Sequence, residues 1–277
     1  MNGRQEASET QPRGSRLWRG LRHPFTRRVL TYLVSIIVLL ALWQLTSGVV
    51  HAIKGRALLP GPFQAFSELI RSIAEIQHHF WVSAGRLVLA MLIALGLGYP
   101  LGLLVGHERR LDQFVSPMIY ITYPIPQVAF ILFLFLVFGI GNAVKVAIVA
   151  VALFFQLLVS ARGAAKNISQ EYITSVLSAG ATRRQVYWHV LLPATLPDIL
   201  TSLRVSVGLG MAFLYIAETS AALGSGLGRF VKGSMYRPAL ASAGIVAMAA
   251  LGLLLYLLID VLERLACRWK YTQQRPR

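Results

Sequence analysis

Residues 84–105 read AGRLVLAMLIALGLGYPLGLLV, a run of 22 residues whose only charged side chain is Arg86. A helix of about 20 apolar residues is long enough to cross the hydrocarbon core of a bilayer. Lipid offers no hydrogen-bond partner to the backbone, so a spanning segment must satisfy its own backbone groups as a helix. This stretch therefore predicts a membrane-spanning helix, and it sets the class of the fold.

The same pattern recurs along the chain. Six spans are predicted, at Val29–Val50, Ala84–Val105, Pro117–Phe138, Asn142–Ala161, Pro197–Ala217 and Leu240–Leu262. The chain is 56% hydrophobic and 14% charged, which leaves too little polar surface for a soluble domain of 277 residues. The sequence predicts an all-α membrane protein with one membrane domain, residues 29–269.

Prolines and glycines mark two of the spans. Pro124 and Pro126 predict a kinked or broken turn in the third span, because proline removes a helix hydrogen bond. Gly98, Gly102 and Gly106 recur at every fourth residue of the second span. This spacing predicts a stripe along which a neighbouring helix approaches closely.

The ends of the chain are polar. Residues 1–28 carry seven arginines and predict a disordered basic tail, and residues 270–277 a short C-terminal tail. The first span, Val29–Val50, is too long for the core of a signal peptide, so we expect an uncleaved helix. After a proline-rich turn, Phe63–Ile76 predicts a short amphipathic helix at the outer surface.

Lysine and arginine follow the alternation of the gaps between spans. One set of gaps holds 18 of them, in residues 1–28, 106–116, 162–196 and 263–277. The other set holds 6, in residues 51–83, 139–141 and 218–239. Because basic loops stay in the cytoplasm, both termini and residues 162–196 are predicted to be cytoplasmic.

Several classes of function are disfavoured by the sequence. The net charge of +16 would permit nucleic-acid binding, but no nucleic-acid module accompanies it. Cys267 is the single cysteine, so no internal disulfide forms. The adjacent His78 and His79 do not have the spacing of metal ligands, and we expect no metal site. No GxxxxGK[ST] motif is present to hold a nucleotide phosphate.

Residues 162–196, which we call the elbow, form the longest cytoplasmic gap. Ile173, Val176 and Leu177 recur at helical spacing before Gly180, and Val186, Tyr187 and Val190 do so after it. Pro193 and Pro197 are expected to end the second helix and to start the next span. The pattern favours a stiff helix, glycine break and helix that a partner could push, or else a helix that only lies flat on the membrane.

The elbow resembles the cytoplasmic coupling motif of binding-protein-dependent ABC permeases. That motif has Glu-Ala-Ala, three residues and Gly, and it ends in Ile/Leu-x-Leu-Pro about nine residues later. Here Thr174-Ser175-Val176 precede Gly180 by the same spacing, and Val190-Leu191-Leu192-Pro193 close the segment. Thr174 departs from the motif's glutamate, although Glu171 lies one turn earlier on the same helix face.

The resemblance covers about Leu59 to Trp269 and is closest to the nitrate, sulfonate and taurine branch. It is carried by Tyr123-Pro124-Ile125-Pro126, Phe138-Gly139-Ile140-Gly141, Ala217-Glu218 with Ser225-Gly226-Leu227-Gly228, and Asp260-Val261-Leu262-Glu263-Arg264. Leu132 and Gln156 depart from it, since these permeases often have proline there.

The resemblance implies a type I ABC importer permease fold in the bacterial inner membrane, surrounded by lipid. It implies three protein partners: an ABC ATPase subunit, a solute-binding protein and a second permease, by default a copy of this chain. ATP would be used by the ATPase, and this chain would be a non-catalytic subunit without a cofactor. The cargo expected for this branch is a small anion such as a sulfonate, taurine or nitrate.

Two groups of site residues follow. The residues expected to couple to the ATPase are Glu171, Thr174, Ser175, Val176, Ala179, Gly180, Ala181, Arg183 and Pro193. The residues considered for the pathway or gate are Gln44, Arg86, Tyr123, Gln127, Asn142, Gln156, Tyr215 and Glu218. Polar groups in spans can equally be interhelical hydrogen bonds. Glu218 either lies at the interface or braces the outer gate, against Arg86 or Arg229.

Two other classes of protein remain open from the residues. A stand-alone secondary transporter or channel would not need an elbow. Its pathway usually carries buried acidic residues, which are rare in these spans. An integral-membrane enzyme would need a set of catalytic groups on one face, and no such set can be placed. Dependence on an ATPase partner separates the permease from both.

Overall fold

The computed structural model describes residues 24–55, 58–122, 124–220 and 224–272, and the regular structure in them is helical. The first half consists of α2 (Pro24–Lys54), α3 (Pro62–Arg71), α4 (Ile73–His107), α5 (Arg109–Thr122), the 3-10 turn η3 (Gln127–Phe130) and α6 (Ile131–Phe138). The second half consists of α7 (Asn142–Lys166), α8 (Gln170–Ser178), α9 (Arg183–Val186), the π-helical turn η4 (Tyr187–Leu191), α10 (Leu192–Ser220), α11 (Leu227–Gly233), α12 (Pro238–Ala266) and α13 (Arg268–Thr272).

The predicted spans are confirmed as helices of membrane-crossing length. Among the described residues five helices are long and apolar enough: α2, α4, α7, α10 with the turns before it, and α12. The pair α5 and α6 passes the same test together, bent by 88° where Pro124 and Pro126 interrupt the helix. With this bent pair counted as one span, the described residues hold six candidate spans, the number predicted.

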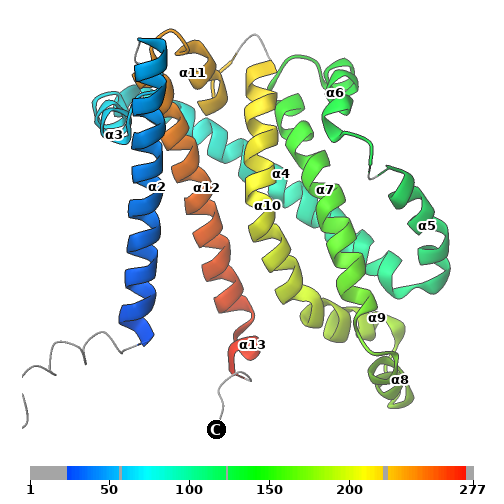
Figure 1. Cartoon of the computed structure of the whole chain (residues 1–277). Helices are drawn as coiled ribbons and strands as arrows, with labels where there is room; N and C mark the ends of the chain where they lie inside the picture. The colour runs from blue at the N-terminus through cyan, green and yellow to red at the C-terminus, as the bar shows by residue number, and fades with distance from the viewer. Residues whose placement is uncertain (1–23, 56–57, 123, 221–223, 273–277) are drawn as a thin grey trace, which may run out of the picture. The chain divides into compact units, whose positions relative to one another are not determined.

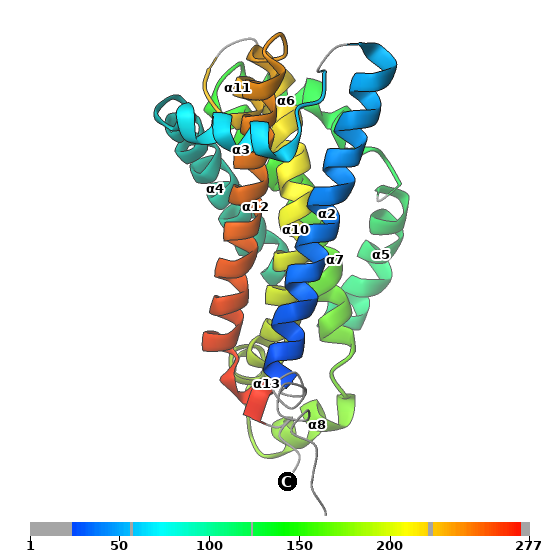
Figure 2. The same ribbon diagram turned by 60° about the vertical axis from the view of Figure 1, so that its left-hand side comes forward.

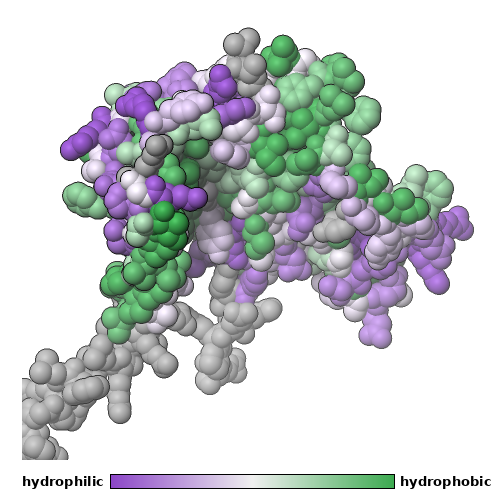
Figure 3. Space-filling model, turned by 45° about the horizontal axis from the view of Figure 1, so that its top comes forward, coloured by the Kyte–Doolittle hydropathy of each residue, from purple (hydrophilic) through white to green (hydrophobic). Residues whose placement is uncertain are grey.

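The chain divides into two compact units between Phe63 and Gln64, and each is described here by itself. In the first unit, most apolar side chains of α2 are exposed. They form the hydrophobic column at the lower left of Figure 3. Its polar contacts are local: Trp43 Nε1 donates to the carbonyl of Pro60 at 3.1 Å, and Ser47 Oγ to that of Leu59 at 2.6 Å. The segment after α2 therefore folds back onto its last turns.

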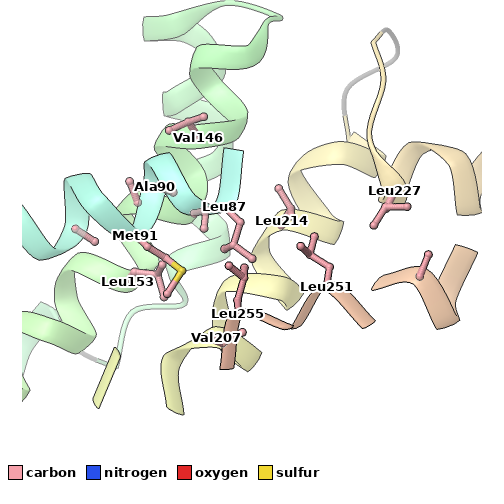
Figure 4. Packing of buried hydrophobic residues seen from close by; sticks show 14 of the residues in the cluster. Leu87, Ala90, Met91, Val146, Leu153, Val207, Leu214, Leu227, Leu251 and Leu255 are labelled. Carbon is pink, nitrogen blue, oxygen red and sulfur yellow. The ribbon is translucent and has the colours of Figure 1, made fainter. Parts of the chain in front are cut away.

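In the second unit, α10 lies between α7 and α12 (Figures 1 and 2). Leucines from four helices, α4, α7, α10 and α12, meet in the main core together with Leu227 of α11 (Figure 4). Leu87, Leu153 and Leu214 are fully buried there. Their burial between spans contributes van der Waals packing, because lipid tails are as apolar as leucine.

The closest helix contact is that of α4 with α7, and the predicted glycine stripe forms it. A Cβ added at Gly98 would lie 3.0 Å from the carbonyl oxygen of Phe154. One added at Gly102 or Gly106 would lie 2.5 Å from the carbonyl oxygen of Leu158 or Arg162, respectively. These three positions admit no side chain because the opposing backbone takes up the space.

Several boundaries differ from the prediction, and α5, for example, begins at Arg109 rather than Pro117. The second span begins at Ile73 rather than Ala84, so the short amphipathic helix α3 ends at Arg71 instead of Ile76. α2 begins at Pro24, five residues before the predicted span. Residues 1–23 of the predicted N-terminal tail and residues 273–277 of the C-terminal tail lie outside the described residues.

The prediction that Pro193 and Pro197 separate two helices was wrong. Helical structure runs without interruption from Arg183 to Ser220, with Pro193 and Pro197 inside α10. The π-helical turn Tyr187–Leu191 directly before α10 changes the hydrogen-bond spacing just where proline withholds a donor. Thr195 Oγ1 donates to the carbonyl of Leu191 at 2.8 Å, a bond within the same helical stretch.

Replacing Gly102 should disrupt the contact between α4 and α7. We expect Gly102→Leu to lower stability by about 1–3 kcal/mol or more, because the new side chain meets backbone atoms that cannot rotate away. Gly96→Leu is the matched control, since Gly96 lies on the same helix with no atom within 4 Å of an added Cβ. Thermal unfolding in detergent measures both; equal midpoints for the two variants would contradict the packing described.

Candidate functional site

The elbow contains a helix, a tight turn and a second helix. α8 ends in a Schellman motif: Gly180 N–H donates to the carbonyl of Leu177 at 3.0 Å, and Ala181 N–H to that of Val176 at 3.3 Å. Gly180 has φ +92°, a region that side-chain-bearing residues rarely adopt. The predicted glycine break is therefore a hydrogen-bonded turn that depends on glycine.

The second helix of the elbow is capped at its start. Thr182 Oγ1 accepts from the backbone N–H of Gln185 at 3.3 Å, and Gln185 Oε1 accepts from the N–H of Thr182 at 2.8 Å. This reciprocal pair is a capping box, which satisfies two donors that a helix start leaves open. A Schellman motif and a capping box in direct succession fix the angle between α8 and α9.

The elbow has a small apolar core of its own. Ile173, Val186, Val190 and Leu191 are buried together, and Val176, Ala181 and Tyr187 are among the side chains packed against them. Ile173 and Val186 are 2% and 1% exposed. The helical spacing read from the sequence thus corresponds to a real packed face, and the elbow is a folded element with a fixed shape.

The residues predicted to couple divide between this core and the surface. Glu171, Thr174, Ser175, Ala179, Gly180 and Arg183 are exposed, whereas Val176, Ala181 and Pro193 are half-buried. The hydroxyls of Thr174 and Ser175 donate to the carbonyls of Gln170 and Glu171, both at 2.9 Å. These hydroxyls bond within their own helix, and α8 presents a small, uncharged surface beside Glu171.

The elbow is fastened to the end of α4. Glu108 forms an ion pair with Arg183 at 3.8 Å and accepts from the Tyr187 hydroxyl at 3.4 Å. The rings of His107 and Tyr187 meet edge to face with centroids 5.1 Å apart. Farther along, the Tyr99 hydroxyl donates to the carbonyl of Leu192 at 2.8 Å. The elbow therefore contacts α4, in addition to being continuous with α7 and α10.

A buried ion pair lies toward the opposite end of α4. Arg86 Nη1 lies 2.7 Å from Glu218 Oε1, and the two side chains are 5% and 0% exposed. Glu218 also accepts from the hydroxyl of Ser83 at 2.8 Å and from the N–H of Gly228 at 2.7 Å. Arg86 Nη2 donates to Asn142 Oδ1 at 2.6 Å. We call these side chains, with Lys145, the polar cluster.

The polar cluster holds the loop between α10 and α11. Arg86 Nη1 donates to the carbonyl of Ser225 at 2.6 Å, while the N–H groups of Gly226 and Leu227 donate to His79 Nδ1 at 3.0 Å and Ser83 Oγ at 2.8 Å. Gly226 has φ +136°, and a Cβ there would overlap the Glu218 carboxylate. Glycine is required for the loop to lie this close to the ion pair.

The charges within the polar cluster are unequal. Lys145 is 2% exposed, and the ammonium group of this residue would lie 2.8 Å from a Cβ at Gly224. Two basic side chains, Arg86 and Lys145, thus accompany one acidic side chain, Glu218. Arg86 Nε is buried and has no hydrogen-bond partner among the described residues. Buried charged groups are costly, and ionisable side chains within membrane spans are candidates for a functional site.

The remaining pathway candidates are scattered. Gln127 begins η3, Gln156 is half-buried in the middle of α7, and Tyr215 is exposed on α10. Among the described residues no hydrogen bond joins any of the three to the polar cluster. Gln44 belongs to the first unit, where its side chain lies beside Gly61, and Tyr123 lies outside the described residues.

Sequence reasoning missed a second ionic cluster, between α10 and α12. Arg204 contacts Asp260 and lies 3.5 Å from Glu263, and Lys270 lies 3.0 Å from Glu263, which is 1% exposed. The four-residue spacing of Asp260 and Arg264, which form an ion pair at 2.9 Å, was the available signal. The cluster ties the two helices together, and among the described residues no group of three His, Cys, Asp or Glu could hold a metal ion.

Comparison with known proteins places the chain in a family. The family described as "Binding-protein-dependent transport system inner membrane component" matches residues 98–266, more than half of the chain. A taurine transport system permease protein, TauC of Escherichia coli, is 32% identical over 90% of this chain and 92% of its own. A putative aliphatic sulfonates transport permease protein, SsuC of Bacillus subtilis, is 28% identical over 84% and 85%. A formylaminopyrimidine transport permease protein, ThiX of Halalkalibacterium halodurans, is 27% identical over 86% and 94%.

A solved structure supports the same fold. An inward-facing form of the MetNI methionine ABC transporter includes a chain that matches 71% of this one and 98% of its own length, with a TM-score of 0.61 and 20% identity. The resemblance read from the elbow and the span motifs is thus confirmed. The chain belongs to the binding-protein-dependent inner membrane components, as a multi-pass permease subunit of an ABC importer.

Proposed function

We propose that this chain forms the translocation pathway of its importer and that the elbow couples this pathway to a separate ATPase. The observation that carries the proposal is the elbow itself: a packed, capped helical turn with an exposed α8, fastened to α4, α7 and α10. A rigid element attached to several spans can pass a displacement to all of them. A helix that only lay flat on the membrane would need none of these attachments.

The proposed coupling surface is the exposed side of α8 and its turn. Glu171, Thr174 and Ser175 lie on α8, and Ala179, Gly180 and Arg183 lie at or just after the turn. Val176, Ala181 and Pro193 act from behind by holding the turn in shape. Small side chains such as Thr174 and Ser175 let a partner approach the helix backbone closely. Without the motif's glutamate at position 174, Glu171 is the acidic group available to a basic residue of the ATPase.

The proposed partners are the ATPase, a solute-binding protein and a second permease. We take the second permease to be a copy of this chain. Val205, Gly208 and Ala212 form an exposed stripe on α10 that suits close helix pairing in lipid. ATP is held by the ATPase, so this chain carries neither a cofactor nor a catalytic residue. The alternative of a stand-alone transporter or channel is not favoured by the curated relatives, which are named as transport permease proteins.

The proposed cargo is a small anion or a small zwitterion with an anionic group. The first choice is a sulfonate such as taurine, which carries both a sulfonate and an ammonium group. Two of the relatives described above are named for taurine or aliphatic sulfonates. The polar cluster supports an anion, because Arg86 and Lys145 outnumber Glu218 in a buried place. Nitrate remains within the same chemical class. The other candidates, Gln127, Gln156 and Tyr215, offer weakly polar groups along the spans and would not hold a substrate tightly.

The proposed role of the Arg86–Glu218 pair is to brace the outer end of the pathway. The pair joins α4 to α10. It also holds the segment Ser225–Gly228, because Arg86 donates to the carbonyl of Ser225 and Glu218 accepts from the N–H of Gly228. Opening this end would have to separate these groups or move them as one body. The brace therefore sets which helices can part on the side that faces the binding protein.

Gly180→Val tests the coupling role. A β-branched residue at φ +92° is strained by about 1–3 kcal/mol, so the turn should change shape. In proteoliposomes with the ATPase and the binding protein, we expect transport-coupled ATP hydrolysis to be largely lost while the chain still inserts. Gly96→Val is the control, because Gly96 lies in helical α4, outside the elbow, with no atom within 4 Å of an added Cβ. Wild-type levels of transport-coupled ATP hydrolysis in Gly180→Val would contradict the proposed coupling role.

Arg86→Met tests the brace. It leaves the Glu218 carboxylate buried without its cation, which should cost about 3–5 kcal/mol and abolish uptake. Adding Glu218→Gln removes the stranded charge, so the double variant should unfold at a higher temperature than Arg86→Met alone. Destabilisation that simply adds up in the double variant would show that the two side chains do not act as a pair.

Competition for uptake tests the cargo. Proteoliposomes with all subunits should transport labelled taurine across the bilayer when ATP is supplied on the side to which the ATPase is bound. We expect excess short alkyl sulfonate to suppress this uptake and an uncharged analogue of the same size to leave it unchanged. Suppression by the uncharged analogue alone would contradict an anionic cargo.

A further inference from the structure

The elbow and the corner between α4 and α5 share one surface. Helix α4 ends at His107 and α5 begins at Arg109, so the chain turns at Glu108, which has extended backbone angles. Glu108 contacts both Arg183 and Tyr187 of the elbow. On the other side of the corner, Asp112 forms ion pairs with Arg162 at 2.6 Å and Lys166 at 2.8 Å. The corner is thus held rigidly beside the elbow.

A cleft lies between the corner and α8. It consists of two adjoining cavities of about 490 and 380 Å³. Both are lined by His107, Arg109, Gln170 and Ile173. Leu177, which is 39% exposed, extends the wall of the larger cavity along α8. The charged lining residues are Arg109, Lys166 and Arg183 against Glu108 and Asp112, so the rim has a basic excess. Ile173 and Leu177 of α8 form an apolar part of the wall.

The surface around the cleft is basic. Residues 107–110 and 170–185 contain four arginines and two glutamates. One of those glutamates, Glu108, is already paired with Arg183. Arg109 is exposed and lines both cavities, and no ion pair of Arg109 occurs among the described residues. An arginine at the rim of a cleft is suited to bind a carboxylate with two parallel hydrogen bonds.

We propose that this cleft is a second docking element for the ATPase, which receives an acidic segment of that subunit against Arg109. The inference rests on the coupling role proposed for the elbow and extends the contact beyond the exposed side of α8. Two observations favour this occupant. The charge of the rim is complementary to an acidic segment, and Gln170, Ile173 and Leu177 belong to the same helix as Glu171 and Thr174. Gln170 and Leu177 are exposed and lie one turn before and after Thr174, so a partner that binds α8 at Thr174 is next to the opening of the cleft.

The contact would change what the ATPase moves. A partner held by α8 alone can pivot about a single helix. With a second contact at the α4–α5 corner it is fixed at two points, and its displacement reaches α4 and α5 directly. Steering by the basic rim would also speed association, because attraction between complementary charges raises encounter rates at low salt.

Charge reversal at Arg109 tests the proposal. The full chain is placed in nanodiscs of neutral phosphatidylcholine, and the affinity and association rate of the ATPase subunit are measured at several salt concentrations. We expect Arg109→Glu to weaken binding about tenfold or more and to reduce the salt dependence of association. Arg110→Glu is the matched control: it is the next residue, equally exposed, and it lines neither cavity. Its affinity should stay within about twofold of wild type.

Four results would overturn the inference. Equal effects of Arg109→Glu and Arg110→Glu would show a general surface charge and no specific contact. An effect of Arg109→Glu confined to nanodiscs that contain phosphatidylglycerol would assign the cleft to lipid headgroups. If Gly180→Val weakens ATPase binding and Arg109→Glu does not, the coupling role stands and only the cleft contact is wrong. Failure of the wild-type chain to bind the ATPase in either nanodisc would remove the proposed function together with this inference.

Discussion

The backbone contact between α4 and α7 is the constraint on which the rest of the second unit depends. Gly98, Gly102 and Gly106 bring the two helices to a distance at which a methyl group would not fit. Because the helices are locked along this line, side chains at both of their ends are placed relative to one another. Arg86 meets Asn142 toward one end, and Asp112 meets Arg162 toward the other. Both functional features are built on this pair.

The two features differ in their physical chemistry, as their proposed roles require. The elbow is held by apolar packing, caps and partly exposed ion pairs, so it keeps its shape in water and can be gripped by a soluble partner. The polar cluster is held by buried charges whose separation is costly, so it favours discrete arrangements over gradual deformation. In the proposed mechanism, a rigid elbow and a polar cluster held by buried charges would together allow a displacement of the elbow to open the other end of the pathway.

Local sequence patterns predicted much of this structure. Apolar runs located the spans, Pro124 and Pro126 the break between α5 and α6, and Gly180 the turn of the elbow. The continuity of α10 across Pro193 and Pro197 was not predicted. The π-helical turn before the helix and the hydrogen bond from Tyr99 to Leu192 cannot be recognised from the residues around the prolines. The polar cluster was also only partly foreseen: Arg86 and Glu218 could be suggested as partners, but Ser83, His79 and the N–H groups of Gly226 and Leu227 join it from more than 100 residues away. Such contacts follow from the packing of α4, α7 and α10, which no single segment encodes.

The proposed ATPase contact at α8 of the elbow can be tested by cross-linking in the assembled importer. Cys267 is the only cysteine and is buried, so a cysteine placed by Thr174→Cys is the one available to an added reagent. The account predicts that this position cross-links to the ATPase in the assembled importer, with a yield that changes when ATP is added. An equivalent cysteine from Arg264→Cys, exposed on α12 and outside both the elbow and the cleft, should cross-link far less. If position 174 cross-links to no ATPase, or does so no more than position 264, the elbow is not the coupling element.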